Sequence, residues 1–335
     1  MNYETIKLEK GMYASPDKSF TQVLEALDPS ENYIGTGMEG LDAYQRQLKR
    51  FDIKVSGAGS DAVQKFFMSS DSSALFPEYV SRAVRQGMEE ANLISSIVAT
   101  TTKINSMDYR TIASVPSEED KSLKRVEAGA VIPQTLIKTQ ENLVRLHKRG
   151  RMLVAPYEAL KFQRLDLFTV TLKQIGAYIA RQQFGDAIEV LMKGDGNDNA
   201  AQVISAEKSG TLSYMDLIGL VNALDPYELN TIIASPDMMM AMLKLEEFKN
   251  PQTGINFQGT GKLNRPMGAD FIKSKAVEAG TILALDKKCA LEMVVAADVV
   301  VDYDKLIDRQ LERAAVTSTS GFAKIFPDAA VVLDV

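Results

Sequence analysis

The sequence has little of the side-chain chemistry that enzymes most often use. Its 335 residues include one histidine, one cysteine and no tryptophan. The single cysteine, Cys289, excludes a disulfide within the chain and fits a reducing compartment. The single histidine, His147, would have to serve any serine or cysteine nucleophile that needs a histidine base. No Cys/His set is present that could build a zinc site.

Long apolar runs and an excess of basic charge are also missing. No stretch reaches the roughly 18 consecutive apolar residues of a membrane span, and the N-terminus lacks the basic-then-apolar pattern of a secretory signal. The net charge is −6, from 38 basic and 44 acidic residues, which gives no indication of a basic groove that grips nucleic acid. The composition is that of a globular protein, which we expect in the cytoplasm where it is made.

Two segments imitate ligand sites but lack the residues that would bind the ligand. The segment "NFQGTGKL" ends like a phosphate-binding loop, yet Asn256 stands where the first glycine is needed and Leu263 where the magnesium-binding hydroxyl is needed. The segment "DGNDNAAQVISAE" begins like a calcium loop, yet Ala200 replaces the turn glycine and Ala206 the bidentate glutamate. We therefore expect neither a nucleotide nor a calcium ion, and no cofactor.

The remaining reactive residues have structural interpretations. His147 lies in "RLHKRGR", with no carboxylate close in sequence, which favours a solvated or partner-facing basic strand. Cys289 is interpreted as a small buried apolar residue, and the methionine run at 238–242 as core filler. The acidic run at 118–120 is interpreted as a solvated loop tip and not as a magnesium site. No convincing catalytic set emerges, so we expect that the protein is not an enzyme.

The first 99 residues separate into an arm and a helix. Residues 1–70 consist of turn and linker chemistry around short apolar groups, which predicts an extended N-terminal arm that is ordered only against another molecule. Residues 71–99 place Pro77 in a first helical turn and then repeat apolar residues at helical spacing. A helix is therefore expected there, ending near Ser95.

Residues 100–150 have the pattern of a β-hairpin, with two Thr-, Ile- and Val-rich limbs on either side of a charged tip. Each limb could hold about 15 residues and reach about 50 Å. Such a ribbon is too long to bury itself in a domain of this size, and an isolated two-stranded hairpin is marginal in water. We therefore expect this segment to lie on another molecule.

The rest of the chain mixes helices and strands. Residues 151–209 contain the longest helical pattern, at 165–193, which Gly194 can end in the left-handed conformation. Residues 210–297 are predicted to combine helices and short strands around a glycine-rich loop, and residues 298–335 to form long terminal strands. The fold class is therefore predicted to be α+β, with a protruding hairpin and arm.

In this order, the segments resemble the major capsid protein of tailed bacteriophages, whose Hong Kong 97-type fold is shared with encapsulins. The resemblance covers about residues 70–335 and lies in the order and local character of the elements more than in a strict motif. The pieces that carry it are "LFPEYVSRAVRQGMEEANLISSIV", "LFTVTLKQIGAYIARQQFGDAIEVLMKGDGND", "TIIASPDMMMAMLKLEEF", "LNRPMG" and "GFAKIFPDAAVVLDV".

The resemblance implies a role for each segment. Residues 165–193 would be the spine helix of a peripheral domain formed by 151–209 and 298–335, and residues 100–150 would be an extended loop that lies over an adjacent subunit. Residues 210–297 would be an axial domain, which packs around five- and six-fold centres. A flexible axial loop near the capsomer centre would contain Gly254, Gly259, Gly261 and Lys262.

Opposite charges at the tip and on the second limb of the extended loop predict a contact between subunits. The acidic run could pair with the basic cluster of a neighbouring copy. The residues of this hypothesis are Glu118, Glu119, Asp120, Lys121, Lys124, Arg125, Arg145, Lys148, Arg149 and Arg151. Some family members crosslink a lysine of this loop to an asparagine of the next subunit. Neither that asparagine nor a catalytic carboxylate can be placed in this sequence, so no crosslink is expected.

By the same resemblance, the chain would assemble through pentamers and hexamers into an icosahedral or elongated shell around double-stranded DNA, which it would contact non-specifically. Its partners would be further copies of itself, a portal protein and a separate scaffolding protein, with no membrane. It would be found in the virion capsid, assembled in the host bacterial cytoplasm. The alternatives are an encapsulin-type compartment shell, which would enclose enzymes and not DNA, and a soluble enzyme, which would bind a small ligand as a monomer.

Overall fold

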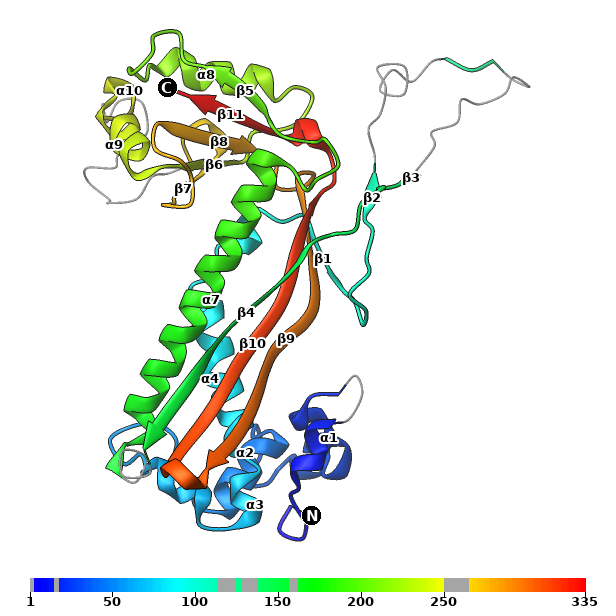
Figure 1. Cartoon of the computed structure of the whole chain (residues 1–335), viewed down its shortest axis with the longest axis vertical. Helices are drawn as coiled ribbons and strands as arrows, with labels where there is room; N and C mark the ends of the chain where they lie inside the picture. The colour runs from blue at the N-terminus through cyan, green and yellow to red at the C-terminus, as the bar shows by residue number, and fades with distance from the viewer. Residues whose placement is uncertain (1–2, 15–17, 114–124, 128–137, 157–161, 250–264) are drawn as a thin grey trace. The chain divides into compact units, whose positions relative to one another are not determined.

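The computed structural model describes residues 3–14, 18–113, 125–127, 138–156, 162–249 and 265–335 (Figure 1). The chain divides into two compact units. Unit 1 comprises Met1–Asn92, Arg149–Ala180 and Asp298–Ser318, and unit 2 comprises Leu93–Lys148, Arg181–Ala297 and Thr319–Val335. The limits between the units fall inside α7, β4, β9 and β10, so these four elements contribute residues to both.

The N-terminal region is helical and packed, which corrects the prediction of an extended arm at 1–70. Its elements are η1 (Lys10–Ala14), α1 (Phe20–Leu27), η2 (Ser30–Tyr33), α2 (Ala43–Arg50), η3 (Val63–Phe67) and α3 (Ser70–Ser73). α1 and α2 each begin with a capping box, formed by Ser19 with Gln22 and by Asp42 with Gln45. The apolar faces of these short helices, including Phe20, are buried in the core of unit 1. This burial holds helices that would be too short to persist alone.

Two longer helices form the frame of unit 1. α7 (Leu165–Lys193) has the bounds that its apolar periodicity predicted, and Gly194 follows it at φ +86° as expected. α4 (Phe76–Glu90) ends before the predicted limit at Ser95, and the 3₁₀ helix η4 (Ile94–Ser96) follows. The hydroxyl of Tyr79 in α4 donates a 2.8 Å hydrogen bond to the carbonyl of Leu165 at the start of α7. The two helices are therefore joined by polar as well as apolar contacts.

A four-stranded sheet has the order β1-β9-β10-β4. Its strands are β1 (Thr100–Lys103), β4 (Leu146–Pro156), β9 (Leu291–Leu306) and β10 (Leu311–Lys324), and the 3₁₀ helix η7 (Ile307–Arg309) joins β9 to β10. β1 pairs in parallel with β9, so that Thr100 lies opposite Glu292. Most of the strand structure at 100–150 thus pairs with the C-terminal strands.

The hairpin prediction therefore does not hold for β1 and β4, which pair with β9 and β10 and not with each other. Among the described residues, its two limbs pair antiparallel at β2 (Ile112–Ala113) and β3 (Lys138–Thr139), and their backbone contacts continue to the hydrogen bond from the Val144 amide to the Tyr109 carbonyl. The physical reason is that β9 and β10 offer sheet edges within the same chain, and these satisfy the backbone groups of β1 and β4. The charged tip lies outside the described residues.

Unit 2 contains a five-stranded sheet of order β5-β11-β8-β6-β7. The strands are β5 (Gln202–Ser205), β6 (Thr231–Ala234), β7 (Asp270–Lys273), β8 (Thr281–Leu285) and β11 (Ala330–Asp334), and the helices are α8 (Tyr214–Ala223), α9 (Pro236–Lys244), α10 (Glu246–Lys249), η6 (Pro266–Gly268) and η8 (Pro327–Ala329). β8 is buried on both faces: Leu283 and Leu285 pack with the end of α7, while Ile282 and Ala284 pack with α8 and α9. β11 pairs with β5, which belongs to the predicted group 151–209, and with β8, which belongs to the predicted group 210–297, so this strand joins the two predicted groups in one sheet.

The methionines at 238–242 differ in burial, as expected for a helix with one buried face. Met239 and Met242 lie in the core of unit 2, whereas Met240 is 58% exposed. No helix in the described part of the chain is long and apolar enough to cross a membrane.

Candidate functional site

The predicted contact residues are only partly described by the structure. Glu118, Glu119, Asp120, Lys121 and Lys124 of the tip, and Gly254, Gly259, Gly261 and Lys262 of the glycine-rich loop, lie outside the described residues. Arg125 is described and exposed. The pairing of an acidic tip with a basic cluster therefore stays a prediction.

The basic cluster is carried by β4 and the residue before it. Arg145, Lys148 and Arg151 are exposed, and Arg149 is half-buried. β4 is an edge strand of its sheet, and basic side chains on an edge discourage pairing with the same edge of another copy. The strand can therefore offer cations to an acidic partner without inviting uncontrolled edge pairing.

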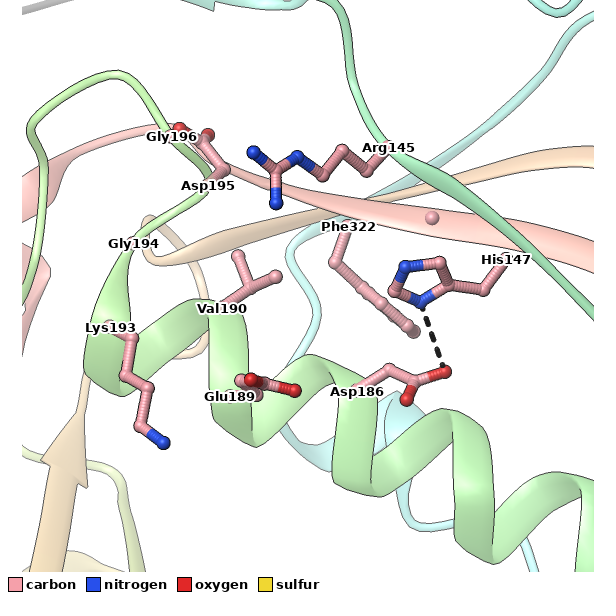
Figure 2. Close-up of a pocket in the computed structure, with 11 residues that line it drawn as sticks. Arg145, His147, Asp186, Glu189, Val190, Lys193, Gly194, Asp195, Gly196 and Phe322 are labelled. Carbon is pink, nitrogen blue, oxygen red and sulfur yellow. Dashed lines mark ion pairs between the residues drawn. The ribbon is translucent and has the colours of Figure 1, made fainter.

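A cavity of about 500 Å³ lies in unit 2 next to the start of this strand (Figure 2). Arg145, just before β4, and His147 of β4 line one side of it, and Asp186 and Lys193 line it from α7. His147 Nδ1 lies 3.6 Å from Asp186 Oδ2, a contact that is an ion pair only when the imidazole is protonated (Figure 2). Both signs of charge line the cavity, so it does not favour a small ion of either sign. Asp186 is the carboxylate that sequence proximity could not reveal, because α7 brings it to His147.

The turn after α7 uses its polar side chains to hold backbone. Asn199 Oδ1 accepts the amide of Asp195 at 3.0 Å, and Asp195 Oδ1 accepts the amide of Asn197 at 3.2 Å. The other oxygen of Asp195 accepts the amide of Lys324 at 3.0 Å. The oxygens that a calcium loop would direct at an ion are thus occupied by backbone amides. Within the described ranges, no group of three His, Cys, Asp or Glu residues could hold a metal ion.

Lys324 is a fully buried lysine at the edge of the same region. Its ammonium donates a 3.2 Å hydrogen bond to the carbonyl of Leu191, in the last turn of α7. Burial lowers the pKa of Lys324 to about 8, against the opposing effect of Asp195 and Asp328. A cation at a helix C-terminus is favoured by the helix dipole, so the residue acts as a buried cap of α7.

A second hollow, of about 210 Å³, lies in unit 1 and is mostly apolar. Its lining includes Phe76 of α4, Phe168 of α7 and Val154 of β4. Exposed apolar side chains continue on the same elements: Val154 is 53% exposed, Leu167 61% and Val170 62%. An apolar surface of this kind, on a protein with an otherwise ordinary core, is typical of a protein–protein contact.

The described residues do not assemble a nucleophile with its base. Burial raises the pKa of the Cys289 thiol, which opposes formation of the reactive thiolate. Cys289 packs at the edge of the core of unit 2 and is only partly buried, so its apolar surroundings agree with the prediction but its burial is incomplete. The features that do stand out are surfaces: the basic and apolar faces of β4 and the apolar face of α7.

Comparisons with known proteins agree with this emphasis on surfaces. Residues 139–326 match the model of a family described as phage capsid protein. A search of curated protein sequences finds no match.

Solved structures with the same fold are remote in sequence. One is the virus-like particle from Pyrococcus furiosus, with 13% identity and a TM-score of 0.51 over 77% of this chain and 99% of that chain. The capsid of a native GTA particle has 15% identity and a TM-score of 0.54 over 72% of this chain and 89% of that one. The capsid of Cyanophage P-SCSP1u has 15% identity and a TM-score of 0.54 over 72% and 88%. At these identities the likeness shows the fold alone.

Proposed function

The chain belongs to the phage capsid protein family and has the Hong Kong 97-type α+β fold, and from that premise we propose that it assembles through pentamers and hexamers into a closed shell around double-stranded DNA. Subunits of one sequence must then make five-fold and six-fold contacts that are alike but not identical. Elements that can change their orientation accommodate the difference between five-fold and six-fold contacts, while the packed cores stay rigid.

The observation that carries the proposal is that β4 presents both basic and apolar side chains to solvent from a sheet edge. Arg145, Lys148 and Arg151 can meet acidic groups of a neighbour, and Val154 can be covered by apolar ones. Each exposed ion pair contributes only about 0.2–1 kcal/mol, so assembly would depend on many such contacts acting together. This favours a subunit that is stable alone and associates cooperatively.

The segments keep the roles that the family resemblance suggested, as part of this proposal. Residues 210–297 would pack around the capsomer centre, with the glycine-rich loop at 250–265 nearest to it. Residues 100–150 would extend over an adjacent subunit. The shell would further require a portal protein and a separate scaffolding protein, and would assemble in the bacterial cytoplasm before the virion is released.

Negative-stain electron microscopy with size-exclusion chromatography of the purified protein tests the proposal. We expect hollow shells, tubes or ring-shaped capsomers, either alone or with a co-expressed scaffold. A protein that stays monomeric or dimeric under both conditions would contradict it.

An encapsulin-type compartment is the second candidate, because encapsulins share the Hong Kong 97-type fold. The contents of purified particles separate the two candidates. Nuclease-protected DNA supports the phage capsid, whereas a co-purifying cargo enzyme supports the compartment.

A further inference from the structure

We infer that the base of the extended loop is positioned on unit 2 by two polar clamps, one for each limb. The first clamp is Glu292 of β9, which holds the limb at 100–113. The second clamp is the turn at 194–199, which holds the limb at 138–146. Together they position the paired strands β2 and β3, through which the chain enters and leaves the rest of the loop. The clamps themselves rest on the hydrogen bonds described below, whereas their role in assembly rests on the proposed function.

The first clamp is a buried carboxylate surrounded by hydroxyl groups. The side chain of Glu292 is 5% exposed. It accepts hydrogen bonds from Thr102 of β1, from Tyr109 at 2.9 Å and from Thr111. A buried carboxylate is costly unless it is hydrogen-bonded, so these three donors offset its desolvation. All three come from the first limb, and the carboxylate therefore holds that limb along almost its whole described length.

The second clamp joins the return limb to the turn after α7. Asn142 donates its backbone amide to Asn197 Oδ1 at 3.0 Å and its side-chain amide to the carbonyl of Gly196 at 2.8 Å. Asn197 in turn donates to Gln140 Oε1 at 2.9 Å, and Gln140 Nε2 donates to the carbonyl of Lys324 at 3.1 Å. The "GDGNDN" segment, which fails as a calcium loop, is thus a cradle for the return limb.

The two limbs are also tied to each other at the same level. Gln140 donates its amide to the carbonyl of Thr111 at 2.9 Å, and Val144 donates its amide to the carbonyl of Tyr109 at 2.9 Å. Arg110 Nη1 donates to the carbonyl of Glu141 at 2.6 Å. The limbs therefore form one short ribbon with a polar anchor on each side.

Little apolar packing supports this ribbon. The local cluster of buried apolar residues contains only Val144, Val294 and Ala323 among the described residues, with Ile104 and Leu146 at its margin. Close-packed cores resist deformation, whereas a hydrogen bond can be exchanged for another at a small net cost, provided that each buried group gains water or a new partner. The start of the extended loop is therefore held in one position in the free subunit by hydrogen bonds. It can change its direction when groups of neighbouring subunits replace those hydrogen bonds.

Hydrogen exchange of the unassembled protein tests the clamps directly. In Glu292→Ala we expect the amides of 104–113 to exchange about tenfold faster or more, while β8 and β11 exchange as in the parent. Glu292→Gln keeps one acceptor oxygen, and hydroxyl groups can rotate to meet its amide, so a smaller effect is expected. Asn142→Ala, at an exposed position that does not endanger folding, should loosen 138–146 in the same way.

Glu228→Ala is the matched control, because it removes an exposed carboxylate of unit 2 that pairs with Lys288, away from both limbs. Unchanged exchange of the limbs in Glu292→Ala and Asn142→Ala would overturn the clamps. So would a uniform acceleration over all of unit 2, which would mean that these residues only add to global stability.

Assembly of the same variants tests whether the clamps position the loop for contacts between subunits. Faster limb exchange with a changed ratio of closed shells to tubes supports the positioning role. Faster limb exchange with unchanged particles overturns that role and leaves the proposed function standing. If the parent protein forms no particles, the proposed function fails, and the exchange pattern still decides whether the clamps exist.

Discussion

Gly176 of α7 lies directly against the carbonyl of Val84 in α4: a Cβ at Gly176 would overlap that oxygen. The relationship is reciprocal, because a Cβ at Gly87 of α4 would overlap the carbonyl of Lys173 in α7. The two helices of unit 1 therefore touch backbone to backbone, and only glycine fits at both positions.

We expect Gly176→Ala to destabilise the protein by about 1–3 kcal/mol, because backbone cannot yield as the end of a side chain can. Urea unfolding, followed by circular dichroism, measures the change. Gly185→Ala in the same helix is the control, since its Cβ would meet only the Cβ of Ala276 at 3.7 Å. It should be neutral or stabilising by about 0.5–1 kcal/mol. Equal losses in both variants would refute the close crossing.

The buried lysine predicts a specific pH dependence of stability. The pKa of Lys324 is lowered to about 8 in the folded protein, while an unfolded lysine titrates near 10.4. Between these values the unfolded state binds more protons, so stability rises with pH in that window. Burial of the charged Lys324 side chain lowers the free energy of unfolding by about 3 kcal/mol. This cost is fully present below pH 8 and is relieved towards pH 10.

Lys324→Met removes this titration. Its stability relative to the parent should be highest below pH 8 and should fall as pH rises to 10, as measured by urea unfolding at several pH values. The loss of the hydrogen bond to Leu191 lowers the free energy of unfolding of the variant by the same amount at every pH. It therefore does not change how the stability difference between the two proteins depends on pH. Parallel stability profiles for the two proteins would rule out a lowered pKa.

The charged tip and the basic strand are expected to meet between subunits. Changing Glu118, Glu119 and Asp120 to lysine should reduce particle yield several-fold, because each weak ion pair recurs throughout the shell. Adding Arg145→Glu and Lys148→Glu to the same chain should restore part of the yield. Particle yield and its salt dependence are read by size-exclusion chromatography and microscopy. An unchanged particle yield with unchanged salt sensitivity would show that the charged tip does not pair with the basic strand.

The apolar face of unit 1 is expected to be covered in the assembled particle. Leu167→Glu should change the free energy of unfolding of the free subunit by no more than about 0.5 kcal/mol, because the side chain is 61% exposed. The same change should strongly reduce assembly, since it would bury a charge. Gln174→Glu, which adds a charge at another exposed position of α7, serves as the control. Normal assembly of Leu167→Glu would show that this face stays in solvent.

The elements that sequence periodicity predicted well are those whose own pattern is long. α7 repeats its apolar residues over eight turns and stops at a glycine, and β6 and β8 are short continuous apolar runs. The helices α1 and α2 were missed because each is only 8 residues long, although their capping boxes, Ser19 with Gln22 and Asp42 with Gln45, are visible in the sequence.

From the sequence alone, the α+β fold class and the bounds of one long helix could be predicted, and the order of the elements indicated the phage capsid family. Which side chains meet across the fold could not be predicted in this way. Glu292 reaches Thr111, Asp186 reaches His147 and Lys324 reaches Leu191 across long stretches of chain. Local pattern reports which face of an element is buried, whereas the partner on that face is chosen by how the elements pack, and no local pattern encodes that choice.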